Sequence, residues 1–436
     1  MLIVLVGARG AGKTTIQNAL RDSGIEILQP STTRPPRFEG EKEYDFVANW
    51  KAANYAWSTL VRDDNYGMRR SELNKARTKT CVTVFDPLTL SIFEGKRRDL
   101  GVESMTIGLD TIRDILEQRR RVGNEENRTI DEAEFERVRA VIAQCDLVVT
   151  GNENVVVSCI LTLIGLIEGR GGVVTKQHLV SLMRADAMLT NAQEANIKSA
   201  SYDLRVGKEI LWQGSIIELT EASPRFEIPA YSYAIVSALE HANLPPCVIG
   251  RFDLKVSYFF EGFILSNGPQ VDPGYKGALF CMIYNGSGRS RILTLGNHFC
   301  TIDFTTTVDV TEGYRQKYQL KQRMAQFVTE ESVIGGGGSI VDLVQKKVKA
   351  VESKVSGIKR NFWTIAAAFI ALGVVVPTLA VPVLWMEIGE IHREKANIEE
   401  SQRRTTALLY IAQRERAQAQ QLLEQASRVL ARRKRG

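Results

Sequence analysis

The first residues that could do chemistry follow a short apolar run at the start of the chain. Residues 7–14, GARGAGKT, fit the pattern G-x-x-x-x-G-K-[ST]. Glycines let backbone N–H groups turn toward phosphate oxygens, and the helix that follows adds its positive dipole. Lys13 would reach the β- and γ-phosphates, and Thr14 would hold Mg²⁺. The pattern predicts ATP and Mg²⁺ as cofactors, bound by Gly7, Gly10, Gly12, Lys13, Thr14 and Thr15.

A second group of candidate residues lies in STTRPPRFEGEKEYDFV, residues 31–47. This segment resembles the acceptor site of the guanylate kinase family, whose pattern is S-x-T-T-R-x-P-R-x-G-E…Y-x-F-V. The resemblance implies that Arg34, Arg37 and Tyr44 grip the phosphate of a nucleoside monophosphate. Guanidinium groups suit this task because each can pair bidentately with a phosphate dianion. The same resemblance adds Ser31, Tyr66 and Asp86 to the expected nucleotide-binding residues.

The run EQRRRVGNEENRTIDEAEFERVR resembles the arginine-rich lid that closes on the triphosphate in the same family. It adds Arg119, Arg121 and Arg137 to Lys13 as expected catalytic residues, although a solvated charge run is the alternative for each arginine. The family reads the guanine edge with a glutamate nine residues before the tyrosine of its Y-G-T motif. Trp57 holds that position here, so we expect poor discrimination between purines.

The second half of the chain carries a different set of motifs. SASYDLRVG, EIPAYSYAIVSALEHANLP, VDPGYKGALFCMIYN and LGNHFCTIDF follow one another within residues 173–330. In this order they resemble the dCTP deaminase and dUTPase superfamily, a trimeric, jelly-roll-like β fold. That family builds its active sites between subunits, so the resemblance implies a homotrimer. The expected pocket residues are Ser201, Asp203, Arg205, Arg251, Asp272 and Tyr275.

Several catalytic positions of that superfamily are altered. Residues 251–256 read RFDLKV where the deaminases have R-S-S-L-x-R, and Met282 replaces the glutamate base of L-E-x-Y-N. A thioether cannot relay protons or activate water. Asp272 matches the base of the dUTPases, although Asp-Pro-Gly is also a common turn. We expect this part to bind a nucleotide without converting it, or to hold the trimer together.

The elements that must position these residues follow from the apolar patterns. LIVLV before the glycine-rich turn reads as a buried strand, and alternating segments such as SRILTLGNHFCTIDF indicate half-buried strands. The expected fold class is therefore multidomain, with a parallel α/β sheet followed by an all-β barrel. A chain of 436 residues is long enough for two or three domains. Six scattered cysteines without a C-x-x-C pair indicate buried free thiols in a reducing compartment.

The C-terminal part is different in composition. Residues 361–386 carry no charge, which predicts a single transmembrane helix, with a buried core helix as the alternative. More basic residues precede this stretch than follow it, so the N-terminal domains would be cytoplasmic and the protein would sit in the inner membrane. The excess of positive charge belongs to this tail, so we expect no nucleic-acid partner.

The expected organisation comprises five parts and leaves three functions open. The favoured function is a membrane-anchored nucleotide sensor and effector, with anti-phage defence as its setting. The alternatives are an active ATP-dependent nucleoside monophosphate (GMP or dNMP) kinase and a dUTPase or dCTP-processing enzyme. The expected parts are a kinase-like domain (1–168), a deaminase-like domain (173–330), a glycine hinge with an amphipathic helix (331–360), the transmembrane helix (361–386) and a basic helical tail (387–436).

Overall fold

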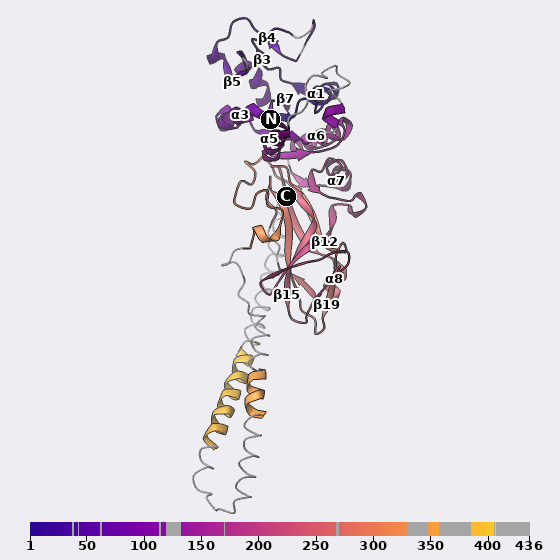
Figure 1. Ribbon diagram of the computed structural model, residues 1–436, viewed down its shortest axis with the longest axis vertical. Coiled ribbons are helices and arrows are strands. Elements are labelled where there is room, and N and C mark those ends of the chain that lie inside the picture. The colour runs from indigo at the N-terminus through magenta and orange to yellow at the C-terminus, as the bar shows by residue number, and fades with distance from the viewer. Residues whose placement is uncertain are drawn as a thin grey trace, which may run out of the picture. The chain divides into compact units, whose positions relative to one another are not determined.

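The fold was analysed in a computed structural model, which Figure 1 traces from the indigo N-terminus. The chain divides into two compact units, residues 1–345 and 346–436. Within the first unit we call residues 1–168 the P-loop region and residues 173–330 the β region. The structure describes residues 1–36, 39–41, 43–61, 63–112, 115–118, 132–169, 171–266, 270–328, 348–356, 385–404 and 406.

A five-stranded parallel sheet forms the centre of the P-loop region, as the sequence predicts. Its first strand is apolar and buried on both faces, which is typical of parallel sheets covered by helices. The strand order is β2-β7-β1-β8-β9, and every described pair runs parallel. The strands are β1 (Leu2–Gly7), β2 (Glu26–Ile27), β7 (Cys81–Phe85), β8 (Ser104–Leu109) and β9 (Leu147–Val149). The longer helices of the region are α1 (Lys13–Asp22), α5 (Glu132–Gln144) and α6 (Glu153–Glu168).

A second, smaller sheet of the P-loop region carries the acceptor-like segment. Its order is β4-β3-β6-β5, with β3 and β4 parallel and the other pairs antiparallel. Its strands are β3 (Ser31–Thr32), β4 (Asp45–Phe46), β5 (Tyr55–Val61) and β6 (Asp64–Arg69), followed by the short helices α2 (Arg70–Leu73) and α3 (Leu90–Lys96). The sheet therefore brings both halves of the predicted acceptor motif together.

The β region is antiparallel throughout its described pairs. Strand β20 alternates between buried and half-buried residues, as expected for a sheet with one face on the core. The nine-stranded sheet contains β10 (Gly172–Val173), β11 (Met188–Thr190), β12 (Ser201–Trp212), β13 (Ser215–Glu218), β15 (Tyr233–Asn243), β16 (Val248–Leu254), β17 (Phe263–Leu265), β18 (Lys276–Asn285) and β20 (His298–Thr306). Strands β14 (Arg225–Ile228) and β19 (Arg291–Thr294) form a separate pair, and the helices are α7 (Lys176–Met183) and α8 (Val256–Phe260).

The predicted single-pass location in the inner membrane is corrected by the structure. Among the residues that the structure describes, no helix is long and apolar enough to cross a membrane. A bilayer crossing needs about 20 apolar residues in one helix, but the described helical stretch 385–404 carries charged side chains along its whole length. The prediction rested on residues 361–386, of which 361–384 lie outside the described residues, as do the four glycines 335–338.

All six cysteines are buried free thiols, which confirms the prediction made from their spacing. The Sγ atoms of Cys281 on β18 and Cys300 on β20 are 3.5 Å apart. Burial raises the pKa of the thiols of Cys145, Cys159 and Cys247 to about 12, so each stays protonated near neutral pH. These cysteines therefore serve packing.

Candidate nucleotide sites

The glycine-rich loop connects β1 to α1. Gly10 and Gly12 have φ values of 87° and 88°, a left-handed conformation that favours glycine. The ammonium of Lys13 donates to the carbonyl oxygens of Gly7 at 2.7 Å and Ala8 at 2.9 Å. Lys13 therefore spans the loop from the helix back to the strand, at the place where the motif expects phosphate.

Electrostatics around Lys13 suit an anionic ligand. Burial lowers the pKa of Lys13 to about 8, and the negative charges of Asp86 and Glu43 partly offset this effect. The hydroxyl of Thr14 donates to Glu43 at 3.0 Å, and the carboxylate of Asp86 accepts from the N–H of Leu88 at 2.9 Å. Mg²⁺ prefers such oxygen donors, so Thr14, Glu43 and Asp86 fit the ion that accompanies ATP.

The acceptor-like residues Arg34, Tyr44 and Tyr66 lie together. The guanidinium of Arg34 forms two hydrogen bonds to the buried carboxylate of Glu41, at 2.6 and 3.2 Å. It also lies 5.4 Å from the ring centroid of Tyr44, whose ring is 5.7 Å from that of Tyr66. The buried Nε of Arg34 has no acceptor among the described residues, so one donor remains for a ligand such as phosphate.

Other predicted residues of this region are placed differently. Ser31 pairs with Gly67 across β3 and β6, while Thr32 pairs with Tyr66. Neighbouring residues of a strand face opposite sides, so Ser31 faces away from Tyr66. The Ser31 hydroxyl donates to Asp45 at 2.9 Å. Thr15 is exposed on α1, and Arg37 lies outside the described residues.

Trp57 occupies the position where the guanylate kinase pattern has a carboxylate. Its side chain is buried, and its ring lies 5.4 Å from that of Phe93 and 5.9 Å from that of Phe85. Its partner on β6 is the fully buried Met68. The position therefore belongs to the core and offers no carboxylate to a guanine edge, and poor purine discrimination stays a prediction.

The predicted lid is seen in part. Arg119 and Arg121 lie outside the described residues, and the exposed Arg137 donates to Ala133 of its own helix at 3.0 Å. Arg139, which the sequence reasoning missed, pairs with Asp110 at 3.4 Å. Asp110 follows the apolar strand β8, a signal that could have identified it. It lines a small cavity beside the glycine-rich loop, together with Ala11, Ile16, Leu109, Thr111, Val149, Gly151, Glu153 and Val156.

Two predicted pocket residues of the β region form ion pairs inside the fold. The guanidinium of Arg205 donates to the fully buried Glu240 at 2.6 Å and to the carbonyl oxygen of Asn191 at 2.6 Å. The buried Asp203 accepts from Lys255 at 3.0 Å. Arg205 pairs with a buried carboxylate and Asp203 with the half-buried Lys255, so both charges are engaged inside the fold. Ser201 is half-buried at the start of β12 and pairs in register with a residue of β20.

The remaining pocket residues surround the turn DPGYKG. Arg251 and Asp272 are both exposed, and each follows one member of the backbone bridge Gly250–Val271. The Tyr275 hydroxyl donates to the carbonyl oxygen of Ala278 at 2.9 Å, and burial raises its pKa well above the ordinary value. Of the six predicted residues, Arg251 and Asp272 are thus the two exposed at the turn.

A segment that the sequence reasoning missed covers this turn. The N–H of Leu320 donates to the carbonyl oxygen of Lys276 at 2.7 Å. The side-chain amide of Gln319 donates to the carbonyl oxygen of Gly274 at 2.9 Å. Gly274 approaches Gly313 so closely that a Cβ atom would lie 2.7 Å from the Gly313 Cα. Residues 313–321 therefore form part of the site.

Met282 lies on β18, which begins at this turn. It is half-buried, pairs in register with Ile235, and its carbonyl oxygen accepts from Ser266 at 3.0 Å. The side chain brings a thioether, so the position has no proton donor or acceptor suited to general acid–base chemistry.

Comparison with known proteins agrees with this division. Residues 173–307 match the family model described as dCTP deaminase-like. The chain is 34% identical to the dCTP deaminase of Pyrococcus abyssi over 143 residues, which is 33% of this chain and 92% of the relative. It is 33% identical to the guanylate kinase of Rhodospirillum rubrum over 116 residues, 23% of this chain and about half (52%) of that enzyme. A solved dCTP deaminase from Agrobacterium tumefaciens is 17% identical and has a TM-score of 0.28, with coverage of 31% and 49%; so low a score adds nothing to the topology described above.

The two regions define a protein built from nucleotide-processing domains, one similar to guanylate kinase and one to dCTP deaminase. Through residues 173–307, the chain belongs to the dCTP deaminase family.

Proposed function

We propose that this protein binds nucleotides in both regions and acts as a nucleotide sensor, and that its β region holds a deoxynucleotide without deaminating it. The observation that carries this proposal is Met282, at the position of the deaminase base. The altered run at residues 251–256 supports it, because Phe252 and Asp253 replace the two serines of the deaminase motif and neither carries a hydroxyl group. A dUTPase-like reaction through the exposed Asp272 is the remaining enzymatic alternative for this region.

For the P-loop region we propose ATP as the ligand, with Mg²⁺. Lys13 would contact the phosphates, and Thr14, Glu43 and Asp86 would hold the ion directly or through water. The bound ion would neutralise phosphate charge, and Lys13 would keep its proton once the phosphates replace the loop carbonyls as its acceptors.

Nucleoside monophosphate kinase activity is the second candidate function. The cluster of Arg34, Tyr44 and Tyr66, with its unpaired Nε donor, favours an acceptor phosphate. The buried Trp57 argues against a guanine-specific acceptor, so a kinase built this way would accept several monophosphates.

The exposed apolar residues of the β region support a homotrimer. Val256, Phe259 and Phe260 on α8 are 68%, 65% and 81% exposed, and Ile264 on the neighbouring β17 is 56% exposed. Contiguous exposed apolar side chains of this size commonly mark interfaces. Light scattering should give the mass of three chains, and Phe260→Asp should lower it to that of one. A wild-type protein with the mass of a single chain contradicts this proposal.

The function is tested by incubating the full chain with dCTP or dUTP and measuring both binding and products. We expect heat of binding in calorimetry, but neither ammonia nor pyrophosphate. The dCTP deaminase of Pyrococcus abyssi serves as the positive control for ammonia release. Release of ammonia from dCTP would refute a non-converting β region, and pyrophosphate would establish the hydrolase. Assays with ATP, Mg²⁺ and a panel of monophosphates decide the kinase alternative by the ADP formed.

The boundaries 1–168 and 173–330 stay predictions, as does the division of the C-terminal unit. Neither the fold nor the comparisons support the anti-phage setting.

A further inference from the structure

Lys276, in the DPGYKG turn of the β region, reaches into the P-loop region. Its ammonium donates to the carbonyl oxygen of Ala143 at 2.6 Å and to that of Cys145. The residue is only 6% exposed. A buried lysine is retained where its N–H groups find acceptors, and these acceptors are backbone atoms at the end of α5.

This contact stabilises the C-terminal end of α5. The last carbonyl groups of a helix lack partners within the helix and carry partial negative charge. The described last turn of α5 has no basic residue of its own. Lys276 supplies the missing cation from 133 residues further along the chain. The C-terminal end of α5 is thus capped by the β region.

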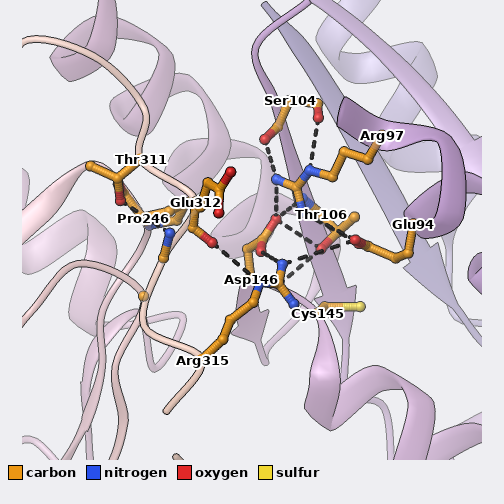
Figure 2. Close-up of polar contacts among 12 residues, drawn as sticks. Glu94, Arg97, Ser104, Thr106, Cys145, Asp146, Pro246, Thr311, Glu312 and Arg315 are labelled. Atoms are coloured by element: carbon orange, nitrogen blue, oxygen red, sulfur yellow. Dashed lines mark hydrogen bonds and ion pairs between the residues drawn. The ribbon is translucent and has the colours of Figure 1, made fainter. Parts of the chain in front are cut away.

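Asp146, just after α5, forms the second part of the same joint (Figure 2). Its carboxylate accepts from Arg97 at 2.7 Å and from the N–H of Thr106 at 2.8 Å, both within the P-loop region. It also accepts from Arg315 at 3.0 Å, which belongs to the segment covering the DPGYKG turn. The DPGYKG turn therefore contacts the end of α5, and the segment that covers the turn contacts Asp146, the residue before β9.

Strand β9 is held by the β region as well. The side-chain amide of Asn243 donates to the carbonyl oxygen of Val148 at 2.6 Å and to that of Asp186 at 2.8 Å. Asn243 also pairs in register with Lys276, so both contacts come from one place on the β15–β18 ladder.

Helix α5 and strand β9 also connect this joint to the cavity beside the glycine-rich loop. From α5, Arg139 pairs with Asp110 at 3.4 Å, and Asp110 lines the cavity. From β9, Val149 lines it directly, as does Ala11 of the loop. A shift of α5 or β9 at the joint would thus change the walls of this cavity.

We propose that Lys276 is a positioning residue for the nucleotide site of the P-loop region, and that the DPGYKG turn couples the two nucleotide sites. A ligand that orders the turn stabilises the cap on α5, and a nucleotide at the loop stabilises the same position of α5. Because linkage is reciprocal, each ligand then changes the affinity for the other by the same factor. The coupling of ligands rests on the proposed function, whereas the positioning by Lys276 does not.

The test uses the full chain, Mg²⁺ with a fluorescent N-methylanthraniloyl ATP, and dCTP as the probe for the β region. Lys276→Met keeps an unbranched, apolar side chain out to Cε and removes the ammonium. The matched control is Arg98→Ala, which removes the exposed Arg98–Glu312 pair of 3.1 Å between the same two regions. Hydrogen exchange of the α5 amides is followed in parallel.

We expect hydrogen exchange of the α5 amides to become about tenfold faster in Lys276→Met and to stay unchanged in Arg98→Ala. The affinity for the ATP analogue should fall about three- to tenfold in Lys276→Met. Saturating dCTP should raise the affinity of the wild type for the ATP analogue about fivefold. Equal exchange and equal affinity in Lys276→Met and wild type would overturn the inference. If dCTP does not bind, the proposed ligand of the β region is refuted. The hydrogen exchange of α5 and the affinity for the ATP analogue still decide the role of Lys276. If Lys276→Met does not fold, Arg315→Met tests the same joint from a half-exposed side chain.

Discussion

Asp146 and Arg315 are 169 residues apart in sequence and form an ion pair of 3.0 Å. Asp146 is also paired with Arg97, so one buried carboxylate joins two guanidinium groups from the two regions. Asp146 and Arg97 are largely buried and need each other as partners, because an unpaired charge inside a protein is costly, whereas Arg315 reaches the cluster from a half-exposed position.

The first prediction concerns this carboxylate. Asp146→Ala should lower the free energy of unfolding by about 3–5 kcal/mol, because it removes the nearer of the two carboxylates paired with Arg97 and the acceptor of the Thr106 N–H. Glu312→Ala, which removes the partner of the exposed Arg98, should cost less than about 1 kcal/mol. Urea unfolding of both variants gives the comparison. Equal losses would show that the Asp146 cluster contributes no more than a surface pair.

The second prediction concerns the pH dependence of nucleotide binding. The pKa of Lys13 is about 8 because burial disfavours its ammonium form, and bound phosphate favours that form. Binding therefore takes up a proton above pH 8, so the affinity for the ATP analogue should fall with rising pH, by up to about tenfold per unit.

Lys13→Arg is the control for that pH dependence, because a guanidinium stays charged throughout the range. Its affinity should fall less steeply than that of the wild type between about pH 7 and pH 9.5. A flat wild-type profile over the same range would contradict the assignment of Lys13 to the phosphates.

The third prediction treats Trp57 as a core residue. Trp57→Ala should cost about 3–5 kcal/mol of stability, since it removes a buried ring packed against Phe85 and Phe93. Trp50→Ala should cost less, because Trp50 is half-buried and stacks on Tyr55 alone among the described ring pairs. Thermal or urea unfolding measures both. A Trp57→Ala variant of unchanged stability but altered purine preference would place this ring in the ligand site instead.

The fourth prediction concerns the contact between Gly274 and Gly313. Gly274 has φ 74°, and a methyl group there would also lie 2.7 Å from the Gly313 Cα. Gly296, with φ 80° and open space around it, is the matched control. Gly296→Ala should cost about 1–2 kcal/mol for the left-handed backbone, and Gly274→Ala clearly more. Faster proteolysis within residues 313–321 in Gly274→Ala would show that the cover has been displaced, and equal cleavage of both variants would contradict this reading.

Local patterns in the sequence were sufficient to predict much of the fold. The apolar run before Gly7 predicts a buried strand, and the glycine spacing up to Lys13 predicts the loop, because both depend on neighbours in the chain. The alternating segments predict the antiparallel strands of the β region for the same reason. The missing base at Met282 is likewise read directly from the motif.

Tertiary structure decided which predicted residues are available to a ligand. Arg205 and Asp203 carry charge in suitable motifs, yet they are buried and paired with Glu240 on β15 and with Lys255, which lies between β16 and α8. Lys276 looks like one residue of a turn until the fold brings it to the end of α5. Hydrophobic periodicity describes an element and the side it buries, whereas a contact across more than 100 residues depends on how the elements pack. For that reason the joint between the two regions could be found only in the folded chain.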